Sequence, residues 1–396
     1  MTAGSDSKPP PYHVMIIAGE PSGDLHGANL VRCLLEIDPS LLITGLGGDL
    51  MQAQGMDLFF HIRNLSVMGV TEVIAQFRVI NRAFRRFRQR VKITRPDLVI
   101  LIDYPGFNLR AAAFARRSGV PVLYYITPKV WAWKRSRLKT IQKVVDHAAL
   151  IFPFEVPLFQ RAGVPATFVG HPLLDCYPEV SVQRKSSAEA GFVIGLLPGS
   201  RETEISTLLD PMLKAALLIR KTDENVRFLV SLAGSVDHQR IIENLDFYNK
   251  KFPDISPLFV PVKGPCKILF DRCDLLIAAS GTVTLEAAIC GVPMIIVYRL
   301  SKLSYLIART FVRLKHVGLA NIIAKEEIVP ELLQDDATAE NIARRALSLL
   351  NRKSLDHMHK RLMIIRKLLG GQGASRRTAR LAVELLRGRS LPDSRK

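Results

Sequence analysis

The sequence predicts two Rossmann-like, doubly wound α/β domains in tandem. Its length of 396 residues exceeds what one ordinary core requires, which favours two domains. Short runs rich in Val, Ile and Leu alternate with helical patterns, as is typical of a parallel sheet covered by helices on both faces. This alternation starts again after a polar segment at residues 178–190. The second start indicates a second domain.

The first half contains a series of expected strands and two clear helical patterns. The strands span residues 14–18, 42–46, 98–102, 122–126, 148–152 and 166–169, and the helices span 25–37 and 109–118. Each strand is a nearly continuous apolar run, as expected for a strand buried on both faces of a sheet.

The second half repeats this architecture without repeating the sequence. Its expected strands span residues 192–197, 227–232, 258–260, 275–278 and 294–297, and a basic helical pattern follows from residue 337. We therefore expect a first domain at 1–184, a second domain at 185–365, and a basic C-terminal helix and tail at 366–396. The two domains should face each other across a cleft, since ligands of such domains bind at the carboxyl ends of the strands.

The composition is that of a folded globular protein. Hydrophobic residues make up 48% and charged residues 23% of the chain. The N-terminus carries no apolar signal-peptide core, and no run reaches the roughly 18 apolar residues of a membrane span, so we expect a cytoplasmic protein with at most peripheral membrane contact. The five cysteines lack metal-ligand spacing and are interpreted as small buried side chains. Neither a metal nor a cofactor is predicted.

The net charge of +19 predicts an anionic partner. No acidic residue lies between Glu72 and Asp97, and a second acid-free stretch runs from Asp103 to Asp146. The first stretch holds Arg78, Arg82, Arg85, Arg86, Arg88, Arg90, Lys92 and Arg95. A solvated basic face is the ordinary interpretation of a charge run. Two such stretches in one half favour an anionic surface instead.

An apolar segment leads directly into the first basic stretch. It comprises Val67, Met68, Val70, Val73, Ile74 and Phe77, followed by Arg78, Arg82, Arg85 and Arg86. An apolar face beside a cationic one is suited to docking on anionic lipid. Burial of the apolar side chains in the core is the alternative, and the pattern does not decide between them.

A Gly-rich turn follows the first strand and includes Glu20, Ser22 and Gly23. Glycines permit close approach of the backbone, and the N–H groups of the next helix favour an anion. Asp24 near the helix start would oppose a phosphate. A simple turn with a helix cap is therefore an equal alternative.

Two turns in the second half are candidate phosphate sites. Gly199, Ser200 and Arg201 follow a strand and offer backbone, hydroxyl and guanidinium donors, although Arg201 could instead pair with Glu204 on the helix surface. The other turn is more specific. Ser280, Gly281 and Thr282 open a helix directly after a buried strand, and Glu286 on that helix can accept both hydroxyls of a ribose.

Asp103 closes a strand of the first half and is followed by Tyr-Pro-Gly. It is either a turn former or a general base at the edge of the cleft, and the local pattern leaves both open. Further on, Trp131 and Trp133 lie among basic residues. Interleaved aromatic and basic residues can bind nucleic acid, but core packing of both rings is the more ordinary outcome.

With these motifs in this order, the chain resembles the lipid-A-disaccharide synthases, which are glycosyltransferases of the GT-B fold. The resemblance runs through GEPSGD, VMGVTEV, IDYPGFN, VWAW, FVGHP, LLPGSR and SGTVTLE, and it covers nearly the whole chain. This chain departs from the family pattern at Pro21, Gly106 and Ala320, which leaves the reaction intact but bears on the acceptor pocket.

The resemblance implies a reaction. UDP-2,3-diacylglucosamine donates its sugar to the 6-hydroxyl of 2,3-diacylglucosamine 1-phosphate (lipid X), which gives a β-1,6-linked disaccharide 1-phosphate and UDP. Inversion at the anomeric carbon requires one general base. By resemblance, Asp103 is the base, Ser200 and Arg201 bind the diphosphate, Glu286 binds the ribose, and Asn321 lies in a segment that faces the donor. No metal is implied, because GT-B enzymes generally stabilise the leaving group with helix N-termini and basic side chains.

The resemblance also implies partners and a location. The enzyme would work on the inner face of the inner membrane, against an anionic surface, with the acceptor bound in the first domain and the UDP-sugar in the second. A homodimer is left open, and nucleic acid is not expected. The alternatives are another GT-B enzyme, such as a peptidoglycan transferase or a UDP-GlcNAc 2-epimerase, and a basic RNA-binding protein. The first class lacks the VWAW stretch, and the second needs no phosphate-binding turns.

Overall fold

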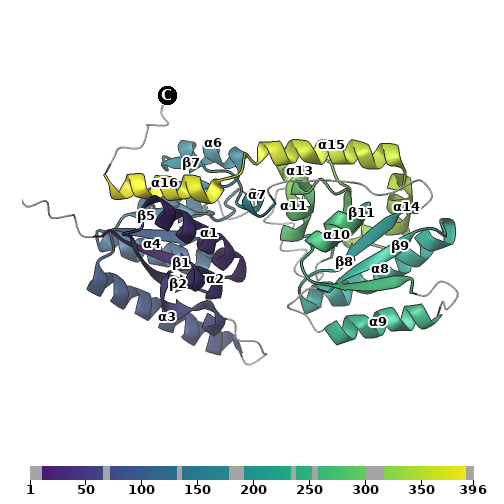
Figure 1. The fold of residues 1–396 in the computed structure, drawn as a ribbon, viewed down its shortest axis with the longest axis horizontal. Helices are drawn as coiled ribbons and strands as arrows, with labels where there is room; N and C mark the ends of the chain where they lie inside the picture. The colour runs from purple at the N-terminus through teal and green to yellow at the C-terminus, as the bar shows by residue number, and fades with distance from the viewer. Residues whose placement is uncertain are drawn as a thin grey trace, which may run out of the picture. The chain divides into compact units, whose positions relative to one another are not determined.

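The computed structural model describes residues 11–65, 72–131, 136–177, 191–232, 238–251, 257–299 and 316–388. The chain divides into two compact units (Figure 1). The first domain comprises Met1–Asp175 together with Leu369–Lys396, and the second domain comprises Cys176–Leu368. Each is built on a parallel sheet, which confirms the predicted pair of α/β domains.

The first domain contains a seven-stranded parallel sheet in the order β3-β2-β1-β4-β5-β6-β7. Its strands are β1 (His13–Ala18), β2 (Leu42–Gly47), β3 (Asp57–His61), β4 (Leu98–Ile102), β5 (Val122–Tyr125), β6 (His147–Leu150) and β7 (Ala166–Phe168). The strand order reverses between β1 and β4, which are paired with Ala18 opposite Ile102. The loops that follow β1 and β4 therefore leave the sheet side by side at a topological switch point. The edge strand β3 was not predicted.

Helices cover both faces of this sheet. They are α1 (Pro21–Ile37), α2 (Asp49–Ala53), α3 (Glu72–Thr94), α4 (Pro105–Arg117), α5 (Ser136–Val144), α6 (Val156–Arg161), α7 (Leu173–Cys176) and α16 (Ala374–Leu386). Both α1 and α4 begin with proline, which is pre-organised for the first helical position. The helices α3 and α4 pack through phenylalanine rings such as Phe87 and Phe107, whose centroids lie 6.3 Å apart.

The C-terminal helix α16 returns to the first domain and packs against α1 (Figure 1). The Arg377 Nε donates to the carbonyl oxygen of Val169 at 2.8 Å, and the Gly373 N–H donates to the Asp175 carboxylate at 2.5 Å. The sequence pattern had set 366–396 apart as a terminal segment, and a local pattern cannot reveal a partner two hundred residues away. The predicted boundary at 184 lies outside the described residues.

The second domain contains a six-stranded parallel sheet in the order β10-β9-β8-β11-β12-β13. Its strands are β8 (Val193–Leu197), β9 (Arg227–Leu232), β10 (Phe259–Lys263), β11 (Leu275–Ala279), β12 (Met294–Tyr298) and β13 (Glu331–Leu333). Its helices are α8 (Glu202–Thr222), α9 (His238–Lys251), α10 (Lys267–Arg272), α11 (Thr282–Ile289), α13 (Leu319–Ala324), α14 (Ala339–Leu349) and α15 (Arg352–Leu368). The switch point lies between β8 and β11, where the two predicted phosphate turns emerge.

The cysteines are all free thiols. Cys33 and Cys290 are buried, as predicted, whereas Cys266 and Cys273 are half-buried and Cys176 is exposed. Within the described ranges, no helix is long and apolar enough to cross a bilayer.

Candidate active site

At the switch point of the first sheet, Glu20 and Asp103 follow the paired strands β1 and β4. The Asp103 side chain is half-buried and Glu20 is exposed. Burial raises the pKa of Asp103 above its ordinary value, the Glu20 carboxylate raises it further, and Lys129 opposes both effects. The structure thus brings together a carboxyl group of increased basicity and a second acid at the sheet edge.

The backbone at Asp103 is strained. Asp103 and Tyr104 have φ angles of 46° and 45°, and the left-handed region costs a non-glycine residue roughly 1–2 kcal/mol. Two side chains hold this turn. The Asn108 amide donates to the carbonyl oxygens of Ile102 at 3.0 Å and Asp103 at 2.7 Å, and the Tyr124 hydroxyl donates to the Asp103 carbonyl oxygen at 2.8 Å. No role for Asn108 or Tyr124 was predicted from the local sequence pattern.

The Gly-rich turn after β1 accommodates the same loop. A Cβ atom on Gly19 would overlap the Tyr104 ring, so the absence of a side chain allows this ring to lie against the backbone. Tyr104 stacks in turn on Phe107, with centroids 5.9 Å apart. Of the predicted residues in this turn, Ser22 is exposed and Gly23 is buried in the first turn of α1. The neighbour that approaches this backbone closely is thus an aromatic ring, and anion binding at the turn stays a prediction.

Asp24 has a structural role that the sequence did not reveal. Its buried carboxylate accepts the backbone N–H groups of Gly48 at 2.8 Å, Leu50 at 3.1 Å and Met51 at 3.1 Å. These groups lie at the N-terminus of α2, so Asp24 caps that helix from another element. The Asp24 carboxylate, which was expected to oppose a phosphate, therefore accepts three hydrogen bonds from the protein's own backbone.

A buried cluster lies behind the edge of the first sheet. The Glu155 carboxyl group accepts the indole N–H of Trp131 at 3.1 Å and the backbone N–H of Phe152 at 3.2 Å, and burial raises the pKa of Glu155 to about 8. The Trp131 ring meets Phe152 and Phe154 edge-on. Trp131 is thus half-buried and packed against other aromatic rings, whereas Trp133 lies outside the described residues. Burial lowers the pKa of the neighbouring His171 to about 3, which keeps that ring neutral at physiological pH.

In the second domain, the turn after β8 contains the ion pair that the sequence left open. Arg201 donates to the Glu204 carboxylate at 2.7 Å, and the Ser200 N–H donates to the other oxygen of Glu204 at 3.0 Å. Gly199 has a φ of +121°, and a Cβ atom there would overlap Glu204. Because the Arg201 side chain is 77% exposed, most of its guanidinium remains accessible. The carboxylate of Glu204 now occupies donors that a phosphate would use.

The turn after β11 is more open. Gly281 and Thr282 are exposed at the N-terminus of α11, and no side chain caps this helix end. The Ser280 N–H continues the sheet by donating to the Val297 carbonyl oxygen at 3.2 Å. Uncapped N–H groups at a helix start are suited to an anion, so this turn keeps the property that the sequence predicted.

Glu286 lies on α11, one turn from that open end. Burial raises the pKa of Glu286, and the Tyr177 hydroxyl, which donates to its carboxylate at 2.9 Å, partly offsets this rise. Tyr177 is a further polar group of this region that the sequence analysis missed. Its distance of 109 residues from Glu286 along the chain explains why.

Asn321 has a different environment from the one implied by resemblance. Its side chain is fully buried, its amide nitrogen donates to the Val329 carbonyl and the Glu331 carboxylate, and its oxygen accepts the N–H groups of Ile328 and Val329. Both polar atoms of its side chain are used within the domain. The structure therefore gives the Asn321 side chain a role in shaping the loop between α13 and β13 and leaves neither side-chain atom for direct contact with the UDP-sugar.

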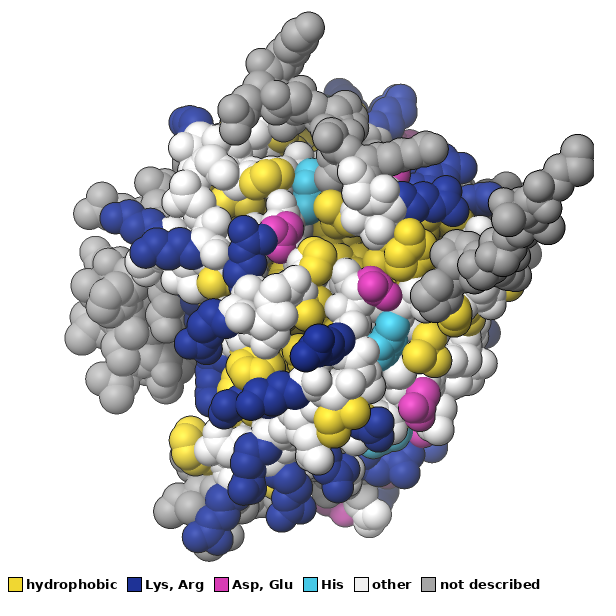
Figure 2. Space-filling view, turned by 90° about the vertical axis from the view of Figure 1, so that its left-hand side faces the viewer, with side chains coloured by type: hydrophobic (Ala, Val, Ile, Leu, Met, Phe, Trp, Pro, Cys, Tyr) yellow, Lys and Arg dark blue, Asp and Glu magenta, His cyan; other side chains and the backbone are white. Residues whose placement is uncertain are grey.

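The residues predicted for membrane docking are described only in part. Val67, Met68 and Val70 lie outside the described residues, as do the side chains of Val73 and Ile74 on α3. The remaining predicted residues, Phe77, Arg78, Arg82, Arg85 and Arg86, are exposed. Figure 2 shows Lys and Arg side chains gathered over the lower part of this face, on the side where α3 lies in Figure 1.

The basic face is partly fixed to the fold. Arg86 donates to the Phe59 carbonyl oxygen at 3.3 Å, and the guanidinium of Arg88 lies 5.0 Å from the ring centroid of Phe114. Among the described residues, no carboxylate pairs with Arg78, Arg82 or Arg85. The charge of these three arginines is therefore available to an anionic partner.

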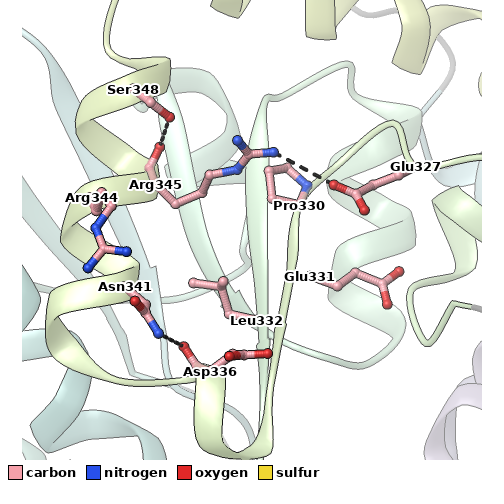
Figure 3. A pocket seen from close by; sticks show the side chains of 9 residues that line it. All are labelled: Glu327, Pro330, Glu331, Leu332, Asp336, Asn341, Arg344, Arg345 and Ser348. Carbon is pink, nitrogen blue, oxygen red and sulfur yellow. Dashed lines mark hydrogen bonds and ion pairs between the residues drawn. The ribbon is translucent and has the colours of Figure 1, made fainter.

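A separate cavity of about 470 Å³ lies beside the edge strand β13 and helix α14 (Figure 3). Its lining mixes both signs of charge, and Arg345 approaches Glu327 at 3.6 Å across it. It contains none of the predicted donor or acceptor residues. Among the residues with described side chains, no three His, Cys, Asp or Glu gather as metal ligands would.

Comparison with known proteins shows similarity along the whole chain. Residues 14–384 match the lipid-A-disaccharide synthetase family. The lipid-A-disaccharide synthase of Geobacter sulfurreducens is 42% identical over 388 residues, covering 95% of this chain and 97% of that protein. The lipid-A-disaccharide synthase of Nitrosococcus oceani is 40% identical over 391 residues, covering 96% of this chain and 97% of that protein.

Solved structures with much lower identity share the fold. MurG of Acinetobacter baumannii has a TM-score of 0.59 at 17% identity, covering 94% of this chain and 100% of that one. The UDP-GlcNAc 2-epimerase of Neisseria meningitidis, bound to UDP-GlcNAc, has a TM-score of 0.61 at 10% identity, also covering 94% and 100%. These likenesses concern the fold alone, and they confirm the GT-B class.

Proposed function

Because this chain belongs to the lipid-A-disaccharide synthetase family, we propose that it condenses UDP-2,3-diacylglucosamine with 2,3-diacylglucosamine 1-phosphate. The products are the β-1,6-linked disaccharide 1-phosphate and UDP. The observation that carries this proposal is the family match over residues 14–384. The family match favours this activity over the other GT-B activities and over a purely RNA-binding role.

In the proposed mechanism, Asp103 is the general base. Its carboxylate takes the proton of the acceptor 6-hydroxyl while the hydroxyl oxygen attacks the anomeric carbon and the bond to UDP breaks. The raised pKa of Asp103 supports this role, because a more basic carboxylate transfers a proton more readily at neutral pH. Glu20 and the first turn of α1, with Ser22 and Gly23, are assigned to the acceptor side.

The donor is assigned to the second domain. Arg201, with Gly199 and Ser200, would bind the diphosphate together with the open helix start at Ser280, Gly281 and Thr282. Glu286 would accept the ribose hydroxyls. Asn321 contributes indirectly in this proposal, by fixing the loop between α13 and β13. The leaving diphosphate is stabilised by these donors, so chelation should leave turnover unchanged.

A direct assay tests the reaction. Purified protein is incubated with both acyl-sugars, and UDP and the disaccharide 1-phosphate are quantified by chromatography and mass spectrometry. We expect the two products in equal amounts. Consumption of UDP-GlcNAc in the absence of an acylated acceptor, with no disaccharide formed from the acyl-sugars, would instead assign the chain to the epimerase type of activity.

We also propose that the first domain docks on the anionic inner face of the inner membrane through α3. Both substrates carry acyl chains, and each exposed arginine near such a surface contributes about 1 kcal/mol. Changing Arg82 and Arg85 to glutamate should reduce binding to anionic vesicles at least tenfold, since two favourable contributions become unfavourable. Co-sedimentation over a salt series measures this.

The matched control for the docking test is Arg32→Glu. Arg32 is also exposed, but it lies on α1, away from α3. Its reversal should leave vesicle binding nearly unchanged. Equal binding of the protein to neutral and anionic vesicles would show that the basic face on α3 is only solvated.

A further inference from the structure

We infer that Tyr124 and Asn108 are positioning residues for Asp103, whose direction they set by holding the backbone turn that follows β4. This inference rests on the proposed role of Asp103 as the base. Neither side chain needs to touch substrate, because each acts on a carbonyl oxygen of the turn.

The turn lies where the sheet ladder ends. Ile102 pairs with Tyr125 across β4 and β5, and the Asp103 N–H still donates to the Tyr125 carbonyl oxygen at 3.2 Å. The chain then leaves the sheet, and no described backbone N–H of a neighbouring strand donates to the Asp103 carbonyl oxygen. The Tyr124 hydroxyl and the Asn108 amide supply two donors to this oxygen, at 2.8 Å and 2.7 Å.

These contacts come from two separate elements. Tyr124 extends from the neighbouring strand β5, and Asn108 lies in the first turn of α4. Both are fully buried. The amide orientation of Asn108 is fixed because its two neighbours are carbonyl oxygens, which require the nitrogen to face them. The Asn108 side-chain oxygen has no hydrogen-bond partner among the described residues. This indicates that the side chain acts through its two N–H donors.

The conformation that they hold determines where the carboxylate points. The φ and ψ angles of a residue set the direction of its Cα–Cβ bond, so a left-handed Asp103 and an extended Asp103 would direct the carboxylate differently. A glycine would adopt this turn without strain, yet the chain has Asp and Tyr in succession with positive φ. Strained backbone that the surroundings over-determine is characteristic of functional positions.

The adjacent residue provides a matched control. The Tyr125 side chain is fully buried like that of Tyr124, but it points to the opposite face of the sheet, because side chains alternate along a strand. Its hydroxyl lies beside the side chains of Ser375 and Thr378 on α16 and takes no part in the Asp103 turn. Tyr125→Phe therefore removes the same group from the same strand without affecting the Asp103 turn.

The experiment compares Tyr124→Phe, Asp103→Asn, the double variant and Tyr125→Phe, with kcat and KM measured for both substrates. We expect Tyr124→Phe to lower kcat about tenfold with KM changed by less than about twofold, because the base is misplaced while binding is retained. Tyr125→Phe should keep both constants. The double variant should be no slower than Asp103→Asn, since a residue that acts through Asp103 has no effect once the base is absent.

The outcomes separate this inference from the proposed function. Normal turnover of Asp103→Asn overturns the base and the inference together. Loss of turnover in Asp103→Asn with normal turnover in Tyr124→Phe overturns the inference alone. An equal loss from Tyr124→Phe in both backgrounds shows a general structural effect and also overturns it. Asn108→Ser, which shortens the donor, should reproduce the kcat loss of Tyr124→Phe.

Discussion

The carboxyl edges of the two sheets are organised in different ways. In the first domain, Asn108 and Tyr124 donate hydrogen bonds to the carbonyl oxygen of Asp103. The Tyr104 ring packs against Gly19, where any side chain would overlap it. In the second domain, the helix start at Gly281 is uncapped and exposed. A group that moves a proton benefits from a fixed direction, whereas a site for a large anion needs unfilled donors. The difference matches the roles that we propose for the two edges.

The largest effect should come from the sheet edge of the first domain, where Asn108 and Tyr124 hold the Asp103 turn. Asp103→Asn should lower kcat about a hundredfold or more and leave UDP binding nearly intact, because the base is lost while the donor site is unchanged. Turnover and UDP titration calorimetry measure the two quantities. In the unmodified enzyme, kcat/KM should fall as the pH drops through the raised pKa of Asp103, because only the carboxylate accepts a proton. An acid limb at the ordinary pKa of aspartate would contradict the buried environment.

An intermediate effect is expected at the sheet edge of the second domain, where the helix start at Gly281 is uncapped. Arg201→Ala and Glu286→Ala should each weaken UDP binding about tenfold, because one removes a charge-assisted contact to phosphate and the other removes the ribose acceptor. Isothermal titration with UDP measures both. Arg32→Ala is the control, since Arg32 also forms an exposed pair with a glutamate, Glu36, at 2.6 Å. Unchanged affinity in both variants would leave the second-domain turns without a ligand role.

The smallest effect tests whether the Glu204 carboxylate occupies part of the proposed phosphate site in the second domain. Glu204 now accepts from Ser200 and Arg201. Glu204→Gln keeps the shape of the side chain and removes its charge, which frees Arg201 for a diphosphate, so UDP affinity should rise about threefold. Glu36→Gln serves as the control at the matched pair. Weaker UDP binding in Glu204→Gln would instead show that Glu204 orients Arg201 for the ligand.

The central strands of both sheets were predictable from the sequence, whereas the edge strands were predicted only in part: β7 and β10 were expected, and β3 and β13 were not. The run at 98–102 is fully buried on both faces, so its apolar character identifies a strand without ambiguity. The missed strands β3 and β13 are edge strands with partly exposed side chains, and β13 has only three residues. A short, half-buried segment carries little periodicity, which makes it hard to distinguish from a loop.

The site residues were predictable where a local motif carries the chemistry. The turns at Gly199 and Ser280 and the strand end at Asp103 are such cases. The contacts that organise them depend on register and on distant segments, as with Tyr124 beside the Asp103 carbonyl and Asp24 at the start of α2. Asn321 shows the limit of inference by resemblance. A resemblance places a residue in a segment without showing which way its side chain points.

The return of α16 to the first domain makes the second domain an insertion within the first, which has a consequence for biosynthesis. A ribosome delivers Met1–Asp175 before the second domain, but the helix α16 that packs against α1 emerges only after that domain. The second domain, complete at Leu368, can therefore finish folding while the first is still missing one of its covering helices. A nascent chain released before α16 would expose the apolar surface that Leu381 and Val383 bury, and it would depend on chaperones although the whole second domain had already been made.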